Sequence, residues 1–221
     1  AQINSVIINS TIRQPVPYAH VGVKDTSTGF TTGETGQFCI ANNNNSYGLV
    51  CLAPGFKTKF ITPEFVGDTI WMESDAQVKE TNAGLLTKST KTWRVGESKK
   101  ENVKSFFEAS KGNPVVVARY FPADKTNSAA FIKQVSLVTH CFIGAARFNL
   151  LLFTKGNNGA PDQWLCNENI LCTAKEGTGI TTIDLSSKHI AVPANGFYVA
   201  VQWLALPSNE YAFQPVDRKS T

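Results

Sequence analysis

Short apolar stretches alternating with polar positions and separated by glycine, proline and asparagine turns run along the first third of the chain. Apolar residues at every second position predict half-buried strands rather than helices. The strands are expected at residues 3–8, 15–23, 28–32, 36–40, 47–56, 57–62 and 68–73. Together they predict a small antiparallel β-sandwich of seven strands.

The same strand pattern returns after Pro114, with strands expected at residues 115–121, 131–138, 146–153, 180–185 and 196–204. Five strands separated by turn clusters predict a second antiparallel sandwich of the jelly-roll kind. Residues 74–92 alternate poorly, and the one short helix is expected at Glu101–Lys111. We therefore predict an all-β chain with domains at 1–73 and 113–221, joined by a linker at 74–112.

The strand phases also predict which side chains form the two cores. The expected buried residues are Phe38, Leu49, Phe56, Val135, Leu150, Leu152, Val199 and Val201. Two tryptophans that flank the linker, Trp71 and Trp93, are expected to pack the domains together.

Several positions in the first domain carry a family resemblance. They are residues 15–21, Thr28-Gly29, Thr32, residues 36–40 and residues 54–58. This segment resembles the carboxypeptidase regulatory-like domain, which implies a transthyretin-like seven-stranded sandwich. The physical basis is visible, because Gly29 and Gly36 suit turns that need positive φ.

The second half resembles an uncharacterised sandwich that often follows this domain in Gram-negative envelope proteins. Its landmarks are residues 148–153, 159–162, 165, 168–170, 182–186, 190–193 and 196–199. Neither resemblance implies an enzymatic activity. They imply a secreted or outer-membrane-associated accessory module that contacts an envelope protein or a glycan.

Charge and hydropathy narrow the choice of partners and of location. Charged residues make up 17% of the 221 residues and the net charge is +4. The basic run Lys88–Lys104 lacks an aromatic-rich face, which favours a solvated linker over a nucleic-acid site. No stretch approaches the ~20 apolar residues of a membrane span. A strand directly after Ala1 is what signal-peptide removal leaves, so a periplasmic, outer-membrane or cell-surface location is expected.

The five cysteines and three histidines show no metal-ligand spacing, so no metal or cofactor is expected. Cys39 and Cys51 flank one predicted turn and are the best disulfide candidates. Strand parity argues against that bridge, because Cys39 alternates with inward Phe38 whereas Cys51 is in phase with inward Leu49.

Catalytic motifs are not supported by the sequence. There is no G-x-S-x-G elbow for a serine nucleophile, and the glycines at 29, 33 and 36 precede no phosphate-loop lysine. The acids Asp162, Glu168 and Asp184 show no catalytic pairing. We predict a non-enzymatic protein that acts through protein contacts, and a hydrolase of unknown type is the remote alternative.

A carbohydrate-binding second domain is the nearer alternative, and it depends on Trp164. This residue follows a long polar loop at 156–163, so its indole could face a sugar ring. Asp162, Gln163 and Asn167 could then hydrogen-bond sugar hydroxyls. A Trp entering a strand is also a common core anchor, and the sequence leaves both roles open.

Overall fold

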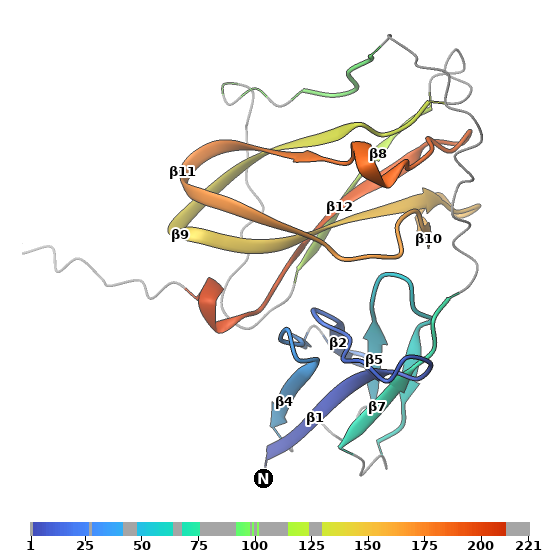
Figure 1. Cartoon of the computed structure of the whole chain (residues 1–221), viewed down its shortest axis with the longest axis vertical. Coiled ribbons are helices and arrows are strands. Elements are labelled where there is room, and N and C mark those ends of the chain that lie inside the picture. The colour runs from blue at the N-terminus through green and yellow to red at the C-terminus, as the bar shows by residue number, and fades with distance from the viewer. Residues whose placement is uncertain are drawn as a thin grey trace, which may run out of the picture.

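The computed structural model describes residues 2–26, 28–41, 48–63, 68–75, 92–97, 99, 101, 115–123 and 130–210. These residues form strands and turns, with two short 3-10 helices and no α-helix among them. The predicted helix at 101–111 lies almost entirely outside this part of the chain. Two β-rich domains lie one above the other in Figure 1, which confirms the all-β class.

The N-terminal domain is a sandwich of two sheets. One sheet has the order β4 (Gln37–Ala41), β1 (Gln2–Asn9) and β7 (Thr69–Met72). The other has the order β3 (Gly29–Thr31), β2 (His20–Val23), β5 (Leu49–Leu52) and β6 (Lys59–Ile61). β1 pairs in parallel with β7, whereas the other pairs are antiparallel. Seven strands in two layers agree with the sequence prediction.

The C-terminal domain contains five strands in one strongly bent sheet. They are β8 (Val116–Phe121), β9 (Gln134–Lys155), β10 (Pro161–Trp164), β11 (Ile170–Asp184) and β12 (Phe197–Trp203). The order is β10-β9-β12-β8, and β11 also pairs with β9. The short 3-10 helices η3 (Ser186–Lys188) and η4 (Pro207–Asn209) precede and follow β12.

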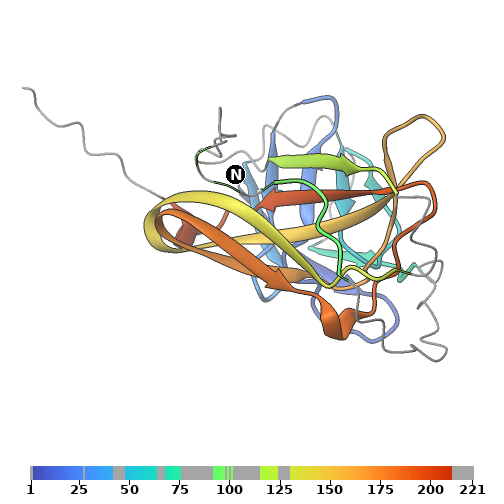
Figure 2. The ribbon, with the colours of Figure 1, turned by 90° about the horizontal axis from the view of Figure 1, so that it is seen from above.

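Strand β9 replaces two strands that were predicted to be separate. Residues 131–138 and 146–153 were expected to be separate, but 22 residues form one continuous strand. The intervening residues look like a break in the sequence, yet Thr139–Cys141 and Ala145 pair with β11, and only residues 142–144 fall outside the register. The pairing register shifts between Lys175 and Gly177 of β11. Such irregularities bend a strand and increase its twist, and Figure 2 shows β9 and β11 curving together.

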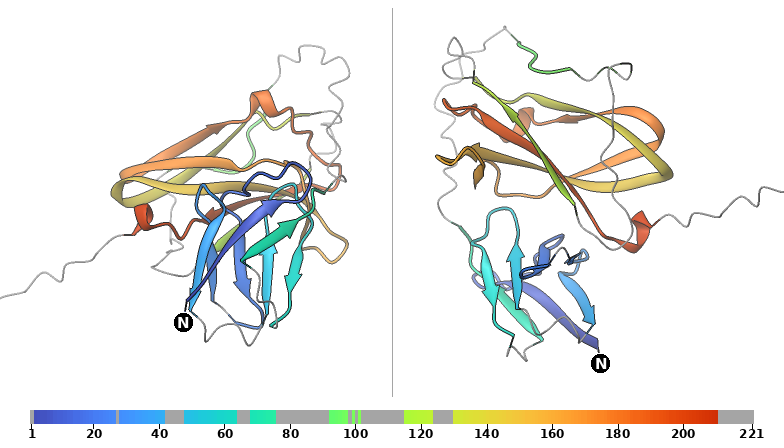
Figure 3. Two further views of the ribbon diagram at one scale, coloured as in Figure 1. Left: turned by 60° about the horizontal axis from the view of Figure 1, so that its bottom comes forward. Right: turned by 180° about the vertical axis from the view of Figure 1, so that it is seen from behind.

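The bend gives this single sheet the two layers of a sandwich. Val135, Leu137 and Ile183 from one half of the ribbon pack in the same cluster as Leu150 and Val199 from the other half. Figure 3 shows the two halves facing each other. The long strand therefore belongs to both layers, and the core lies between them.

The predicted core residues lie where strand parity placed them. Phe38, Leu49, Leu150, Leu152 and Val199 are buried. Phe56, Val135 and Val201 are half-buried and pack against the same clusters. The core assignment is confirmed.

All five cysteines are free. Cys39 is exposed on β4, whereas Cys51 is fully buried on β5 in the opposite sheet. The parity argument against a Cys39–Cys51 bridge is confirmed, because Cys39 is exposed whereas Cys51 belongs to the buried core.

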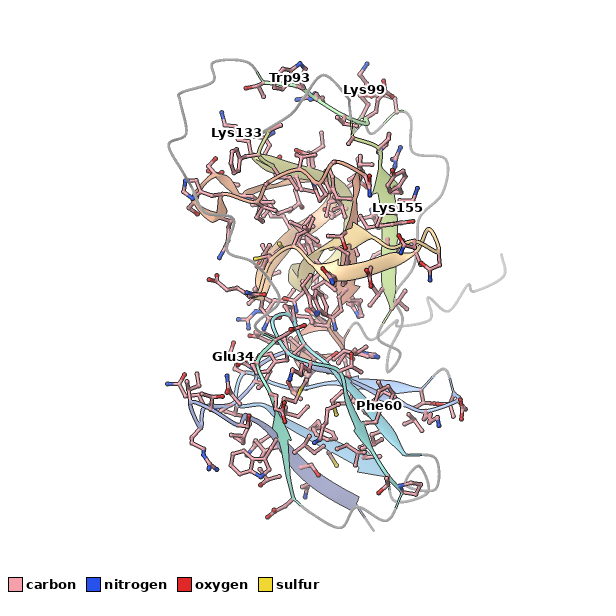
Figure 4. The ribbon with its side chains drawn as sticks, turned by 90° about the vertical axis from the view of Figure 1, so that its right-hand side faces the viewer. Glu34, Phe60, Trp93, Lys99, Lys133 and Lys155 are labelled. Carbon is pink, nitrogen blue, oxygen red and sulfur yellow. The ribbon has the colours of Figure 1, made fainter. Side chains whose placement is uncertain are left out.

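The prediction that Trp71 and Trp93 pack the domains together is wrong. Trp71 is 41% exposed on β7, where the guanidinium carbon of Arg13 lies 4.5 Å from the indole centroid. Trp93 is 47% exposed and lies at the end of the molecule away from the N-terminal domain (Figure 4). The prediction failed because an indole has a polar N–H group and can stay partly exposed to solvent instead of packing at an interface.

Candidate functional site

Four aromatic side chains form a row across the outer face of the C-terminal sheet. They are Tyr120 on β8, Tyr198 on β12, Phe153 on β9 and Trp164 on β10. Tyr198 pairs directly with Tyr120 on one side and with Phe153 on the other, and Phe153 pairs with Trp164. We call these four residues the aromatic row.

Strand alternation explains why the row faces away from the core. Leu152 precedes Phe153 on β9, and Val199 follows Tyr198 on β12. Both Leu152 and Val199 belong to the core cluster. Successive side chains of a strand point to opposite faces of the sheet. Trp164 likewise precedes Leu165, which packs against the core. All four aromatic residues are half-buried.

Two pairs of neighbouring rings in the row contact each other. The ring centroids of Phe153 and Trp164 are 4.4 Å apart, and those of Tyr120 and Tyr198 are 5.3 Å apart. The Nζ atom of Lys155 lies 4.7 Å from the Tyr120 centroid, so a cation covers one end. With strands about 4.8 Å apart, four strands give a row roughly 14 Å long. The row is therefore an extended surface.

Two loops hold the tyrosine rings through their hydroxyl groups. The Tyr120 hydroxyl donates to the carbonyl oxygen of Asn195 at 2.8 Å, and the Tyr198 hydroxyl donates to that of Gly159. The second loop is closed by a 2.8 Å bond from the amide of Gly156 to the carbonyl of Ala160. The rings are thus fixed before any ligand arrives, which reduces the entropy cost of binding.

The residues predicted from sequence lie at one end of this row. Trp164 is part of it, and its ring is tilted by 35° against that of Phe153 on the outer face. Asp162 and Gln163 precede Trp164 on β10 and are exposed, and the backbone N–H of Gln163 donates to the Thr154 hydroxyl at 3.0 Å. Asn167 is exposed in the loop after β10. The structure thus brings Trp164, Asp162 and Gln163 together on one edge strand.

Sequence reasoning missed Tyr120, Tyr198 and Phe153 as site residues. Each lies near the end of a predicted strand, next to a core residue of the opposite parity. The signal was present as an aromatic residue at an outward position on three predicted strands. Strand order and register were needed to place the three side by side.

The N-terminal domain is seated on the same sheet face, beside the row. Asn149 and Gln202 are the outward residues further along β9 and β12, and both are buried. The Asn149 side-chain amide donates to Asn169 Oδ1 at 3.0 Å and to Gln202 Oε1 at 3.2 Å. Asn169 in turn donates to the carbonyl oxygen of Pro17, in the N-terminal domain, at 2.9 Å.

A second part of this domain interface combines apolar and charged contacts. Tyr18 packs in a buried cluster with Leu204 and Leu206 from the C-terminal domain. Its hydroxyl donates to Glu34 Oε1 at 2.9 Å, and Arg147 Nη1 donates to the same oxygen at 2.7 Å. Figure 4 shows Glu34 on the side of the N-terminal domain that faces the other domain. We use "domain interface" for these contacts and those of Pro17.

Contacts at the domain interface shift the pKa values of Glu34, Tyr18 and Arg147. The hydrogen bond from Arg147 holds the pKa of Glu34 below its ordinary value, and the bond from Tyr18 acts in the same direction. Burial raises the pKa of Tyr18, and the Glu34 carboxylate adds to that effect. Glu34 also raises the pKa of Arg147. The ion pair is solvent-exposed, so it orients the domains more than it stabilises them.

The described parts of the chain offer neither a cluster of metal ligands nor a membrane-spanning helix. Within them, no three His, Cys, Asp or Glu side chains gather closely enough to hold a metal ion. The described residues also contain no helix that is long and apolar enough to cross a membrane.

Comparisons with known proteins concern the N-terminal domain. Residues 3–86 match the family model of the CarboxypepD_reg-like domain. This confirms the resemblance inferred from residues 15–58. No curated protein and no solved structure matches the chain.

Proposed function

The N-terminal domain belongs to the carboxypeptidase regulatory-like domain family, whose model matches residues 3–86. From the aromatic row of the C-terminal domain we propose that the chain is a non-catalytic carbohydrate-binding module. The C-terminal sheet would bind the glycan, and the N-terminal domain would serve as its accessory domain. The proposal includes a location outside the cytoplasm, as expected for a secreted or outer-membrane-associated protein of the cell envelope.

The aromatic row is the observation that carries this proposal. Ring faces provide apolar area with few rotatable bonds, and sugar rings present flat C–H faces that pack on them. Four such residues on adjacent strands form an extended platform rather than an isolated stacking position. This geometry favours a chain of sugar units over a single small ligand.

Polar groups at the Trp164 end supply the second element of a sugar site. Asp162 and Gln163 are exposed next to Trp164 and offer a carboxylate and an amide to hydroxyl groups. Lys155 adds a cation above the opposite end of the row. A mainly apolar surface with a few placed polar groups is the usual composition of ligand sites.

Replacing Trp164 with alanine tests the proposal directly. Affinity electrophoresis on a panel of neutral and acidic polysaccharides should show retention of the wild type and its loss in Trp164→Ala. Because Trp164 is half-buried, the stability cost should stay below the roughly 3–5 kcal/mol of a buried aromatic truncation. Circular dichroism and urea unfolding check that the variant remains folded.

Trp71→Ala is the matched control, because it removes a partly exposed indole from the other domain. It should be retained like the wild type. Equal retention of Trp164→Ala and wild type would refute the role of the row. If the wild type binds no polysaccharide, the carbohydrate proposal fails.

Protein contact is the second candidate, favoured by one feature of the N-terminal domain. Phe60 lies on β6, the edge strand of its sheet, and is 68% exposed beside 37% exposed Leu52 on β5. Exposed aromatic residues on a sheet edge are common in protein interfaces. The described residues contain no observation that favours the hydrolase alternative.

A further inference from the structure

We propose that the N-terminal domain positions the ligand-binding end of the aromatic row by clamping the loop that follows β10. The proposed consequence for binding rests on the carbohydrate-binding function above. The clamp itself concerns Trp164 and residues 165–169, and it can be tested without a ligand. It gives the accessory domain a defined role in the site.

The clamped loop begins directly after Trp164. Its first residue, Leu165, donates a backbone hydrogen bond to the carbonyl of Leu152 at 2.8 Å. Asn169, its last residue, donates to the carbonyl of Pro17. Between them, Glu168 forms an ion pair with Lys188 of η3. One end of the loop is thus fixed to the C-terminal core and the other to the N-terminal domain.

Gly55 brings the backbone of the N-terminal domain close to this loop. An ideal Cβ at Gly55 would lie 2.4 Å from the carbonyl oxygen of Asn167 and 3.1 Å from its Cβ. Real Cβ atoms do not approach backbone oxygen atoms that closely. Gly55 also has φ +78°, which disfavours other residues. The backbone of the N-terminal domain at Gly55 therefore packs directly against Asn167 of the C-terminal domain, three residues after Trp164.

The clamp is connected to the strands that carry the rest of the row. The Asn149 side chain links Asn169 to Gln202, so a buried amide network joins the loop to β9 and β12. These strands also carry Phe153 and Tyr198, each four residues from the network. Loss of the N-terminal contact would remove the partner of the Asn169 side-chain amide, at one end of this network.

Position matters because a stacking site must be held within about 0.5 Å of its productive geometry. Trp164 lies on a short edge strand whose register with β9 is irregular. Such a strand has few backbone bonds of its own to hold it. The N-terminal domain supplies the missing constraint through Gly55 and Pro17.

The experiment compares two glycine variants of the full chain. Gly55→Ala adds a methyl group that meets the Asn167 carbonyl. Gly177→Ala is the matched control, because Gly177 also has φ +78° but nothing lies within 4 Å of an added Cβ. Both variants carry the same backbone strain, and only one disturbs the clamp.

Two measurements are made on each variant. Hydrogen exchange followed by mass spectrometry should show faster exchange in residues 164–169 for Gly55→Ala and unchanged exchange there for Gly177→Ala. Affinity for the polysaccharide that wild type retains should fall by about tenfold or more in Gly55→Ala. Gly177→Ala should stay within about twofold of wild type.

Asn169→Ala provides a second variant if Gly55→Ala does not fold. It removes the bond to Pro17 together with the acceptor of the Asn149 amide, and it should raise exchange in the same loop. Unchanged exchange at 164–169 in the folded variants would overturn the clamp, whatever the protein binds. Faster exchange with unaltered affinity would overturn its role in binding. Lack of wild-type binding refutes the proposed function alone, because the exchange measurement still tests the clamp.

Discussion

Replacing Leu204 with alanine tests how strongly the domain interface holds the two domains together. Leu204 is fully buried in the cluster with Tyr18 and Leu206. Truncating a buried leucine removes transfer energy and leaves a cavity, which together cost about 2–5 kcal/mol. Whole proteins are stable by only about 5–15 kcal/mol. We therefore expect a clear decrease in the free energy of unfolding.

The assay is urea unfolding of the full chain, followed by circular dichroism and tryptophan fluorescence. Tyr18→Ala and the double variant complete a double-mutant cycle across the interface. Because Leu204 packs on Tyr18, the two changes should couple by about 0.5–3 kcal/mol. Leu150→Ala is the control, since Leu150 belongs to the separate C-terminal cluster. Its effect should add to that of Tyr18→Ala within about 0.5 kcal/mol.

Two results would refute this reasoning. A cost of less than about 1 kcal/mol for Leu204→Ala would mean that the cluster is not closely packed. Additive effects of Tyr18→Ala and Leu204→Ala would mean that the residues do not contact in solution. Either result would also remove the apolar part of the domain interface.

The remaining predictions concern pH and thiol reactivity. Because the pKa of Glu34 lies below its ordinary value of 4.5, its contribution is complete above that value and is lost as pH falls through the lowered pKa. Wild type should exceed Glu34→Gln in urea midpoint at neutral pH, with the gap closing in acid, and a gap independent of pH would contradict the ion pair. An aromatic disulfide reagent at pH 8 should modify exposed Cys39 in the native state, and Cys39→Ser should remove this reaction. Burial raises the pKa of Cys51 to about 12 and that of Cys172 to about 11, so both should react only after unfolding, and rapid native modification of Cys51 would contradict its placement.

The period-two pattern was sufficient to predict the fold class and most of the core. Phe38 and Ile40 alternate with Gln37 and Cys39, so the inward direction of Phe38 follows from local geometry. Leu150 lies in an apolar run at residues 148–153, in which only Asn149 is polar. The turn role predicted for Gly36 is confirmed by its φ of +71°, whereas Gly29 is the first residue of strand β3 and does not have positive φ. The same alternation predicted that Cys39 faces solvent and Cys51 faces the core.

Features that depend on distant pairing could not be predicted in this way. Residues 139–145 look like a break until the pairing of residues 139–141 and 145 with β11 is known. Trp164 was identified from its loop, whereas Tyr120 and Tyr198 become site residues only through strand register. The domain interface was assigned to Trp71 and Trp93, because nothing in the local sequence distinguishes Tyr18 or Asn149 as contacts. Separate folding of fragments cut between Met72 and Trp93 stays a prediction.

The parallel pairing of β1 with β7 has a consequence for the order in which the N-terminal domain can form during synthesis. Val6 of β1 lies opposite Thr69 of β7, so the central strand of this sheet lacks one neighbour until residues 69–72 are available. Contacts between residues so far apart in sequence form slowly, and an unpaired strand edge can meanwhile pair with another chain. A ribosome-bound chain that ends before β7 should therefore be more prone to aggregation than one that extends past it.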